Sequence, residues 1–437
     1  MPSAQPTLEA ADAAIAAGRE SEAEDILRQI LAQGVQHDSD AMATSAATPA
    51  ASQLDQDTAR TQEAALNKLA SLYAQQKQSQ KLASLVKDSR LFMTRLPKAR
   101  TAKLIRSLID KFDAIPDAKE TQVEVTKENI EWAREERRVF LRQSLETRLI
   151  GLYFDLTQYR DALPLIDSLL KELKRLDDKM VLTEVHLLES RVLHALKNLP
   201  RSKAALTSAR TAANAIYCPP LLQAQLDMQS GVLHAEDKDY TTAYSYFFET
   251  LEGLSAAEDS RAPLALKYML LCKIMLNSSD DVSALVDGKM AAKYAGRDVG
   301  AMKAVATAHE KRDLGAFETA LREYKAELSN DPIIRNHLAA LYDTLLEQNL
   351  LRIIEPYSRV EINHIAKAVQ QPVREVEQKL SQMILDKVFS GILDQGAGCL
   401  VVFDDPAPDK TYEATLETLK HVSNVVDSLA LKAKSLS

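Results

Sequence analysis

The sequence of 437 residues contains little glycine and few aromatic residues, with 12 glycines and 5% Phe, Trp and Tyr. Alanine, leucine, lysine, glutamate and glutamine are abundant instead, and this balance favours helices over sheets. The three cysteines (Cys218, Cys272 and Cys399) lie far apart. They indicate free thiols in a reducing compartment rather than a disulfide framework. No uncharged apolar run approaches about 18 residues, and residues 1–17 lack the apolar core of a secretory signal, so we expect no membrane span.

Catalytic and cofactor motifs are also missing. The sequence contains no phosphate loop, no His-Glu-x-x-His and no Gly-x-Ser-x-Gly elbow. Its eight histidines show no metal-ligand spacing, and even His186 and His194, which are eight residues apart, share a helix side only roughly. Adjacent acidic residues such as Asp177 and Asp178 are typical of helix caps and turns. We therefore expect no enzyme activity, no cofactor and no metal site.

Repeated helix pairs are the main pattern of the body of the chain. Residues 10–31 predict two helices with Gly18 near the turn between them, and residues 38–57, rich in Ala, Ser and Thr, predict a flexible loop. Further on, Tyr159, Leu199 and Tyr240 begin similar segments at spacings of 40 and 41 residues. Such a spacing is typical of degenerate tetratricopeptide-like repeats, which stack to share one core.

The small residues Ala162, Ser202 and Ala243 occupy the same place in each repeat, where they would let paired helices approach closely. Weaker copies of the pattern begin at Ser279 and Leu314. We therefore predict a mainly α protein built on a right-handed α-solenoid.

The C-terminal part of this array ends differently. Residues 390–403 contain two short apolar segments around a turn with Gly396 and Gly398, which predicts a β-hairpin. Apolar helices over residues 360–369 and 372–388 precede it, so the hairpin completes a winged helix. We predict four divisions of the chain: a helical solenoid over 1–220, further repeats over 221–332, the winged helix over 333–405 and a last helix over 406–437.

Charge decides between the two usual roles of a winged helix, which are nucleic-acid binding and protein association. The helix over residues 372–388 carries Arg374, Lys379 and Lys387 against three acidic residues, so its net charge is zero. The whole chain has a net charge of -8. A phosphate-binding surface would need a cationic excess. We expect no nucleic-acid binding and instead predict pairing of the wing with another protein. The wing residues nominated for this contact are Ile392, Leu393, Leu400 and Val402.

The last helix has an apolar stripe. Its members recur at steps of three and four residues, close to a heptad seam. They are Leu416, Leu419, Val422, Val426, Leu429, Ala433 and Leu436. Such a helix needs a partner surface. It can fold back on its own chain, but we favour a helical bundle with other subunits.

Several strings resemble the PCI-domain family, whose members are helical repeats capped by a winged helix. The block 341–360 carries the general likeness. Residues 187–191, 207–219, 244–249, 379–387 and 391–396 resemble the PCI-domain lid subunits of the 26S proteasome regulatory particle, of the sixth non-ATPase type. The resemblance extends from about Asn129 to the C-terminus and is weak before about Arg60.

The resemblance implies a non-catalytic scaffold of the cytoplasm and nucleus. Its expected partners are other PCI subunits of the lid, the helical bundle of lid subunits, the proteasome ATPase ring and the outer ring of the core particle, with no nucleic acid and no membrane. Two alternatives stay open. One is a PCI scaffold of the signalosome or of translation initiation factor three, and the other is a winged-helix nucleic-acid binder.

Overall fold

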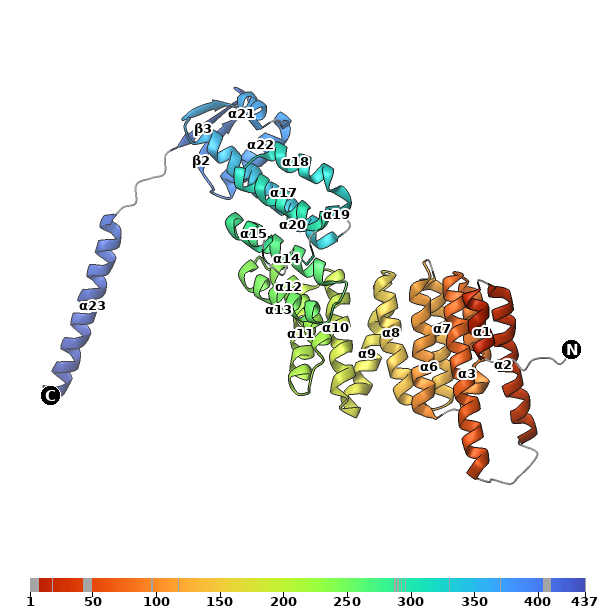
Figure 1. The fold of residues 1–437 in the computed structure, drawn as a ribbon. Coiled ribbons are helices and arrows are strands. Elements are labelled where there is room, and N and C mark those ends of the chain that lie inside the picture. The colour runs from red at the N-terminus through yellow and green to blue at the C-terminus, as the bar shows by residue number, and fades with distance from the viewer. Residues whose placement is uncertain are drawn as a thin grey trace. The chain divides into compact units, whose positions relative to one another are not determined.

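The computed structural model describes residues 8–17, 19–41, 49–95, 97–116, 118–286, 288, 291, 293–294, 296–329, 331–369, 371–403 and 410–436. The chain divides into two compact units, Met1–Ser260 and Arg261–Ser437. Helices dominate both of them (Figure 1). This single division at Ser260 does not test the finer domain boundaries expected near residues 220, 332 and 405, which stay predictions.

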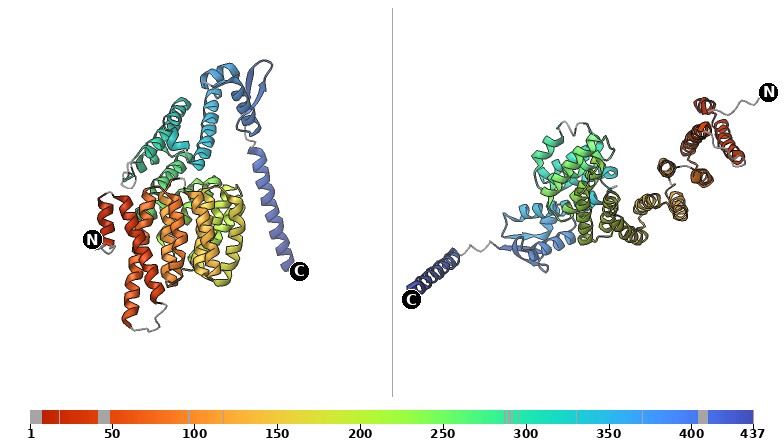
Figure 2. Two further views of the ribbon diagram at one scale, coloured as in Figure 1. Left: turned by 90° about the vertical axis from the view of Figure 1, so that its right-hand side faces the viewer. Right: turned by 90° about the horizontal axis from the view of Figure 1, so that it is seen from below.

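The first unit is a row of helices that lie side by side (Figures 1 and 2). In chain order they are α1 (Leu8–Ala16), α2 (Glu20–Ala41), α3 (Pro49–Gln75), α4 (Ser79–Asp88), α5 (Arg90–Arg95), α6 (Lys98–Asp110), the short 3-10 helix η1 (Lys111–Ala114), α7 (Lys119–Glu135), α8 (Val139–Asp155), α9 (Tyr159–Leu176), α10 (Lys179–Ala195), α11 (Leu199–Asn214), α12 (Pro220–Glu236) and α13 (Tyr240–Ala256). One cluster of buried apolar residues runs from Ala11 to Val192, and a second joins α10, α11 and α12. Stacked pairs therefore share their core, as in a helical solenoid.

The repeat predicted from sequence is confirmed. Tyr159, Leu199 and Tyr240 are the first residues of α9, α11 and α13. The small residues Ala162, Ser202 and Ala243 are completely buried. Ser202 also donates a hydrogen bond of 2.8 Å from Oγ to the carbonyl oxygen of Ser190, across the contact between α10 and α11. A small side chain at this position lets the second helix of each pair lie close to the first.

The turns between paired helices share one backbone form. A single non-glycine residue adopts a left-handed conformation, and the next amide donates to the carbonyl five residues earlier, as in a Schellman motif. After α8, Thr157 has φ 59° and the amide of Gln158 donates to the carbonyl oxygen of Tyr153 at 2.9 Å. The same form recurs at Lys77, Arg137, Lys197, Lys238, Asn277 and Arg312. The repeats thus turn without the glycines that usually occupy this position.

The expected loop over residues 38–57 is wrong over part of its length. Residues 38–41 end α2, and residues 49–57 begin α3. Residues 42–48, and Gly18 in the expected first turn, lie outside the described residues. Alanine and glutamine have high helix propensity, and here that propensity outweighs the shortage of large apolar residues. The expectation of two helices over residues 10–31 is confirmed by α1 and α2.

The second unit begins with further helices and ends in a winged helix and a long last helix. The helices before the first strand are α14 (Ala262–Met275), α15 (Ser279–Val286), α17 (Arg297–Lys311), α18 (Leu314–Glu323), α19 (Lys325–Ser329) and α20 (Pro332–Ile354). Then come β1 (Arg359–Glu361), α21 (Ile362–Val369), α22 (Val373–Leu385), β2 (Ser390–Asp394), β3 (Cys399–Phe403) and α23 (Lys410–Leu436). Ser279 and Leu314 begin α15 and α18, as the repeat pattern predicts.

The predicted hairpin is confirmed, because β2 pairs antiparallel with β3 and Leu393 lies opposite Leu400. The sheet also contains a strand that the sequence analysis missed. β1 pairs with the other side of β3, and the strand order is β1-β3-β2. The helix expected to begin at Val360 therefore begins at Ile362. A strand of three residues shows no periodicity, and its partner lies 40 residues further along the chain, so local sequence does not reveal it.

Candidate assembly surfaces

The apolar stripe of α23 is the largest candidate surface. The nominated residues Leu416, Leu419, Val422, Val426 and Leu429 are 46% to 60% exposed, and the side chain of Leu436 lies outside the described residues. At 3.6 residues per turn these positions share one face of the helix. Among the described residues, no element buries this stripe. A helix that leaves such a row of apolar side chains in water is expected to gain stability from a partner.

The sequence analysis missed exposed residues on the same helix. Tyr412 lies four residues before Leu416 and seven before Leu419, so it extends the stripe toward the helix start. Val425 borders the stripe, and Leu431 lies about a third of a turn away from Leu419. All three are more than half exposed. The i, i+4, i+7 spacing of Tyr412 was available in the sequence and is the signal that could have found it.

The sheet of the winged helix presents the second candidate surface. Because β3 is paired on both sides, β1 and β2 are the two edge strands of the described sheet, and β2 is the longer of them with five residues. Directly paired residues share a face of an antiparallel sheet. Ile392, paired with Val401, is 58% exposed, and Phe403 on the same face is 48% exposed. Leu385, the last residue of α22, and Val388, between α22 and β2, are also exposed. These apolar residues, Leu385, Val388, Ile392 and Phe403, form what we call the wing patch.

Only part of the nominated wing residues can contact a partner. Ile392 belongs to the wing patch. Leu400 is 0% exposed and lies on the central strand, so its assignment to an exposed wing edge is wrong. Val402 also lies on the central strand rather than at an edge, and Leu393 and Val402 are half-buried on the same sheet face as Leu400. The burial of Leu400 comes from its sheet face, because Phe403 on the same strand but the opposite face is 48% exposed, and the unpredicted strand β1 removes the free edge of β3.

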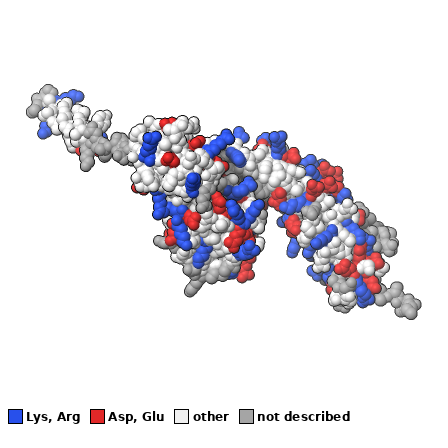
Figure 3. Space-filling view, turned by 90° about the horizontal axis from the view of Figure 1, so that it is seen from above, with Lys and Arg blue, Asp and Glu red and all other residues white. Residues whose placement is uncertain are grey.

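The charges of the winged helix are partly used inside the unit. The ammonium of Lys379 on α22 binds the Glu347 carboxylate of α20 at 2.8 Å, and the Lys379 side chain is mostly buried. One of the three cations predicted for this helix is therefore already bound to a carboxylate of the same unit. Figure 3 shows acidic and basic side chains interspersed over the face it presents. No cationic patch stands out on the face that Figure 3 presents, and a phosphate backbone would need a local excess of cations.

The buried titratable groups act within the fold. His186 pairs with Glu189 at 2.8 Å and His194 with Glu236 at 3.7 Å, so the two histidines turn to different carboxylates. Burial raises the pKa of the Cys272 thiol to about 12, which keeps it a neutral, poorly nucleophilic thiol. Burial and the nearby Arg312 lower the pKa of His309. In the described part of the chain no three His, Cys, Asp or Glu residues gather as metal ligands, and no helix is long and apolar enough to cross a membrane.

Three segments of the sequence match family models of known proteins. Residues 4–156 match the family model of the 26S proteasome regulatory subunit RPN6 N-terminal domain. Residues 321–404 match the PCI domain, and residues 408–434 match the 26S proteasome subunit RPN6 C-terminal helix domain. The first match covers the region before about Arg60 where the sequence analysis found only weak likeness. The third coincides with α23 and its stripe.

Whole-length relatives agree with these matches. The probable 26S proteasome regulatory subunit rpn6 of Schizosaccharomyces pombe is 52% identical over 428 residues, which cover 98% of each chain. The 26S proteasome regulatory subunit RPN6 of Saccharomyces cerevisiae is 47% identical over 404 residues, or 91% of this chain and 93% of the relative. The 26S proteasome non-ATPase regulatory subunit 11 homolog of Arabidopsis thaliana is 52% identical over 377 residues, or 86% and 90%. The chain therefore belongs to the RPN6 family of 26S proteasome regulatory subunits.

Proposed function

We propose that this chain is a non-catalytic scaffold of the proteasome lid, and that α23 holds it there by entering a helical bundle with other lid subunits. The exposed stripe from Tyr412 to Leu429 is the observation that carries this proposal. These residues span about 26 Å along the helix axis. A seam of that length fits a helical bundle with knobs-into-holes packing. The match of residues 408–434 to a family-specific C-terminal helix supports the same role.

The wing patch is proposed as the contact with a neighbouring PCI subunit of the lid. Its apolar residues Ile392 and Phe403 lie on the outer sheet face, next to the unpaired edge of β2. An edge strand can accept another strand through main-chain hydrogen bonds, and the apolar side chains beside it would give such a contact its selectivity. The central strand β3 has no free edge, and it contributes the outer-face residues Val401 and Phe403 that lie opposite β2.

The first unit is proposed to reach the ATPase ring and the outer ring of the core particle, so that the chain links lid, base and core. Stacked helix pairs form long surfaces that suit several moderate contacts rather than one deep site. The chain would thereby support assembly of the particle and ubiquitin-dependent protein degradation in the cytoplasm and nucleus.

The test is deletion of residues 416–437 in the full chain, followed by affinity purification from cells and identification of the co-purified subunits. The intact chain should bring down lid subunits, proteasome ATPases and core-particle subunits. The shortened chain should stay folded by circular dichroism and lose the lid subunits. Normal lid incorporation of the shortened chain would refute the bundle role. Signalosome or ribosomal partners for the intact chain would refute the assignment to the lid.

A further inference from the structure

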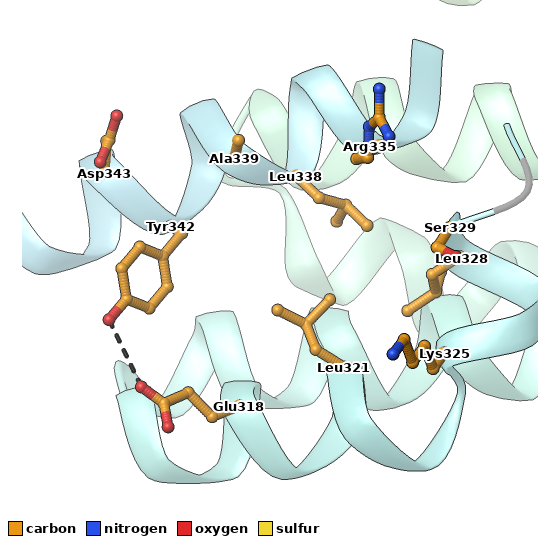
Figure 4. A pocket seen from close by; sticks show the side chains of 10 residues that line it. All are labelled: Glu318, Leu321, Lys325, Leu328, Ser329, Arg335, Leu338, Ala339, Tyr342 and Asp343. Atoms are coloured by element: carbon orange, nitrogen blue, oxygen red, sulfur yellow. Dashed lines mark hydrogen bonds between the residues drawn. The ribbon is translucent and has the colours of Figure 1, made fainter. Parts of the chain in front are cut away.

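A groove runs between α18–α19 and α20 in the second unit (Figure 4). It encloses about 490 Å³. Leu321 from α18 and Leu338 from α20 point toward each other across it, and Leu328 from α19 completes the apolar floor (Figure 4). Leu328 and Leu338 are buried and Leu321 is half-buried. Leu321 therefore supplies most of the accessible apolar surface that these leucines give the groove, above the buried Leu328 and Leu338.

One end of the groove is closed by a hydrogen-bonded cluster. The Tyr342 hydroxyl donates to Oε1 of Glu318 at 3.4 Å, as Figure 4 shows. The side-chain amide of Gln371 donates to both, at 3.1 Å to Glu318 Oε1 and 2.9 Å to the Tyr342 hydroxyl. Helices α18 and α20 and the turn between α21 and α22 thus meet at this end, and their mutual hydrogen bonds hold the wall in place. Asp343 adds a second carboxylate beside it.

The opposite end carries two cations. Lys325 and Arg335 line the groove there, together with Ser329 (Figure 4). Both cations are exposed, and neither forms an ion pair with another residue of the described chain. The groove therefore has a cationic end and an anionic end with an apolar floor between them. On α20 the two ends, Arg335 and Asp343, are eight residues or about 12 Å apart, which is slightly more than two helical turns.

We propose that this groove binds a short amphipathic helix of a partner protein, with its apolar face on Leu321 above the buried Leu328 and Leu338, and its acidic end beside Lys325 and Arg335. Apolar helix faces bind such grooves through residues at i, i+3, i+4 and i+7. Acidic residues are most favourable at the start of a helix, so the bound helix should run in the same direction as α20. The proposal concerns a different surface from α23 and does not rest on the lid role.

The probe is a synthetic fluorescein-labelled peptide of two to three helical turns, with Glu at its start, a leucine stripe and Lys at its end. Fluorescence anisotropy with the purified full chain should give a dissociation constant of about 10–100 µM, because the contact is much smaller than a standard interface. A peptide with the same composition but a broken stripe should bind at least about tenfold more weakly.

Charge reversal gives the sharper test. The double variant Lys325→Glu, Arg335→Glu should bind the acid-first peptide at least about tenfold more weakly and should bind better to a peptide with Lys first and Glu last. The matched control is Arg352→Glu, which reverses an exposed cation at the far end of the same helix α20 and should leave binding unchanged.

Leu321→Asp should also weaken binding about tenfold, because it places a charge in the apolar floor. Circular dichroism should confirm that each variant is folded, and the reversed peptide keeps the test valid even if Leu321→Asp is unstable. Equal binding of the broken-stripe peptide, no response to charge reversal, or no binding of any peptide would each overturn the proposal. Deletion of residues 416–437 should leave peptide binding intact, which separates this proposal from the bundle role.

Discussion

Replacing Leu419 and Leu429 on α23 by alanine should weaken assembly without weakening the isolated chain. Both side chains are 60% exposed and lie on the apolar stripe. Alanine keeps the helix, because it has the highest helix propensity of any residue. The isolated chain therefore loses no buried contact, and its thermal unfolding midpoint should not fall.

The cost appears only when α23 is buried in a bundle. Burying a whole leucine side chain contributes about 1.5–3 kcal/mol, so burying the remaining 60% of each leucine contributes about 1–2 kcal/mol. The pair together then contributes about 2–4 kcal/mol to the assembled state, which corresponds to about a 30- to 700-fold weaker association. Leu431→Ala is the matched control, because Leu431 is 70% exposed but lies about a third of a turn away from Leu419.

The assay has two parts. Native gel electrophoresis after co-expression with the other lid subunits measures incorporation, and differential scanning calorimetry measures the isolated chain. The double variant should incorporate poorly and unfold at the wild-type temperature, while Leu431→Ala should behave as wild type in both. Full incorporation of the double variant would refute the bundle argument. A midpoint lowered by several degrees in the isolated chain would show instead that the stripe packs on its own chain.

Three further predictions concern the fold. Thr157→Gly should raise the unfolding free energy by about 0.5–1 kcal/mol in denaturant titration, since Thr157 is a β-branched residue held at φ 59°; an unchanged midpoint would show that the turn is not strained. Gly231→Val should cost about 1–3 kcal/mol, because a Cβ at residue 231 would lie 2.6 Å from Cε1 of Phe247, and Phe247→Leu should recover part of the loss. Burial raises the pKa of Glu184, and Asp178 raises it further, so folding disfavours its charged form. Glu184→Gln should therefore raise the melting temperature at pH 7. This gain should vanish as the pH falls below the ordinary glutamate pKa of about 4.3, because both side chains are then neutral. A gain in melting temperature that persists at low pH would contradict this cause.

Local patterns predicted most of the helices, because they repeat within a few residues. The anchors Tyr159, Leu199 and Tyr240 begin their helices as expected, and the small residues after them are buried. The loop expected over residues 38–57 failed for a different reason. A shortage of large apolar side chains predicts little burial, but it does not prevent an alanine-rich segment from forming a helix.

Local patterns likewise predicted one candidate surface and failed for the other. The stripe of α23 follows from spacing alone, because every member lies within one helix. The wing residues do not, because their exposure depends on which face of the sheet packs against the rest of the unit. Leu400 and Ile392 look alike in sequence, yet one is buried on the central strand and the other is exposed on the edge strand.

The sequence by itself determined the helical repeats, the hairpin, the apolar seam of the last helix and the family resemblance, since each depends on neighbouring residues or on strings of them. Only the tertiary structure decided that β1 covers β3, that the wing patch includes Leu385 and Phe403, and that Gln371 joins Glu318 and Tyr342 to close the groove. The Gln371 hydrogen bonds join residues 29 and 53 positions apart, and the central pair of β1 and β3 joins residues 40 positions apart. Such contacts arise from packing between elements, which local periodicity does not encode.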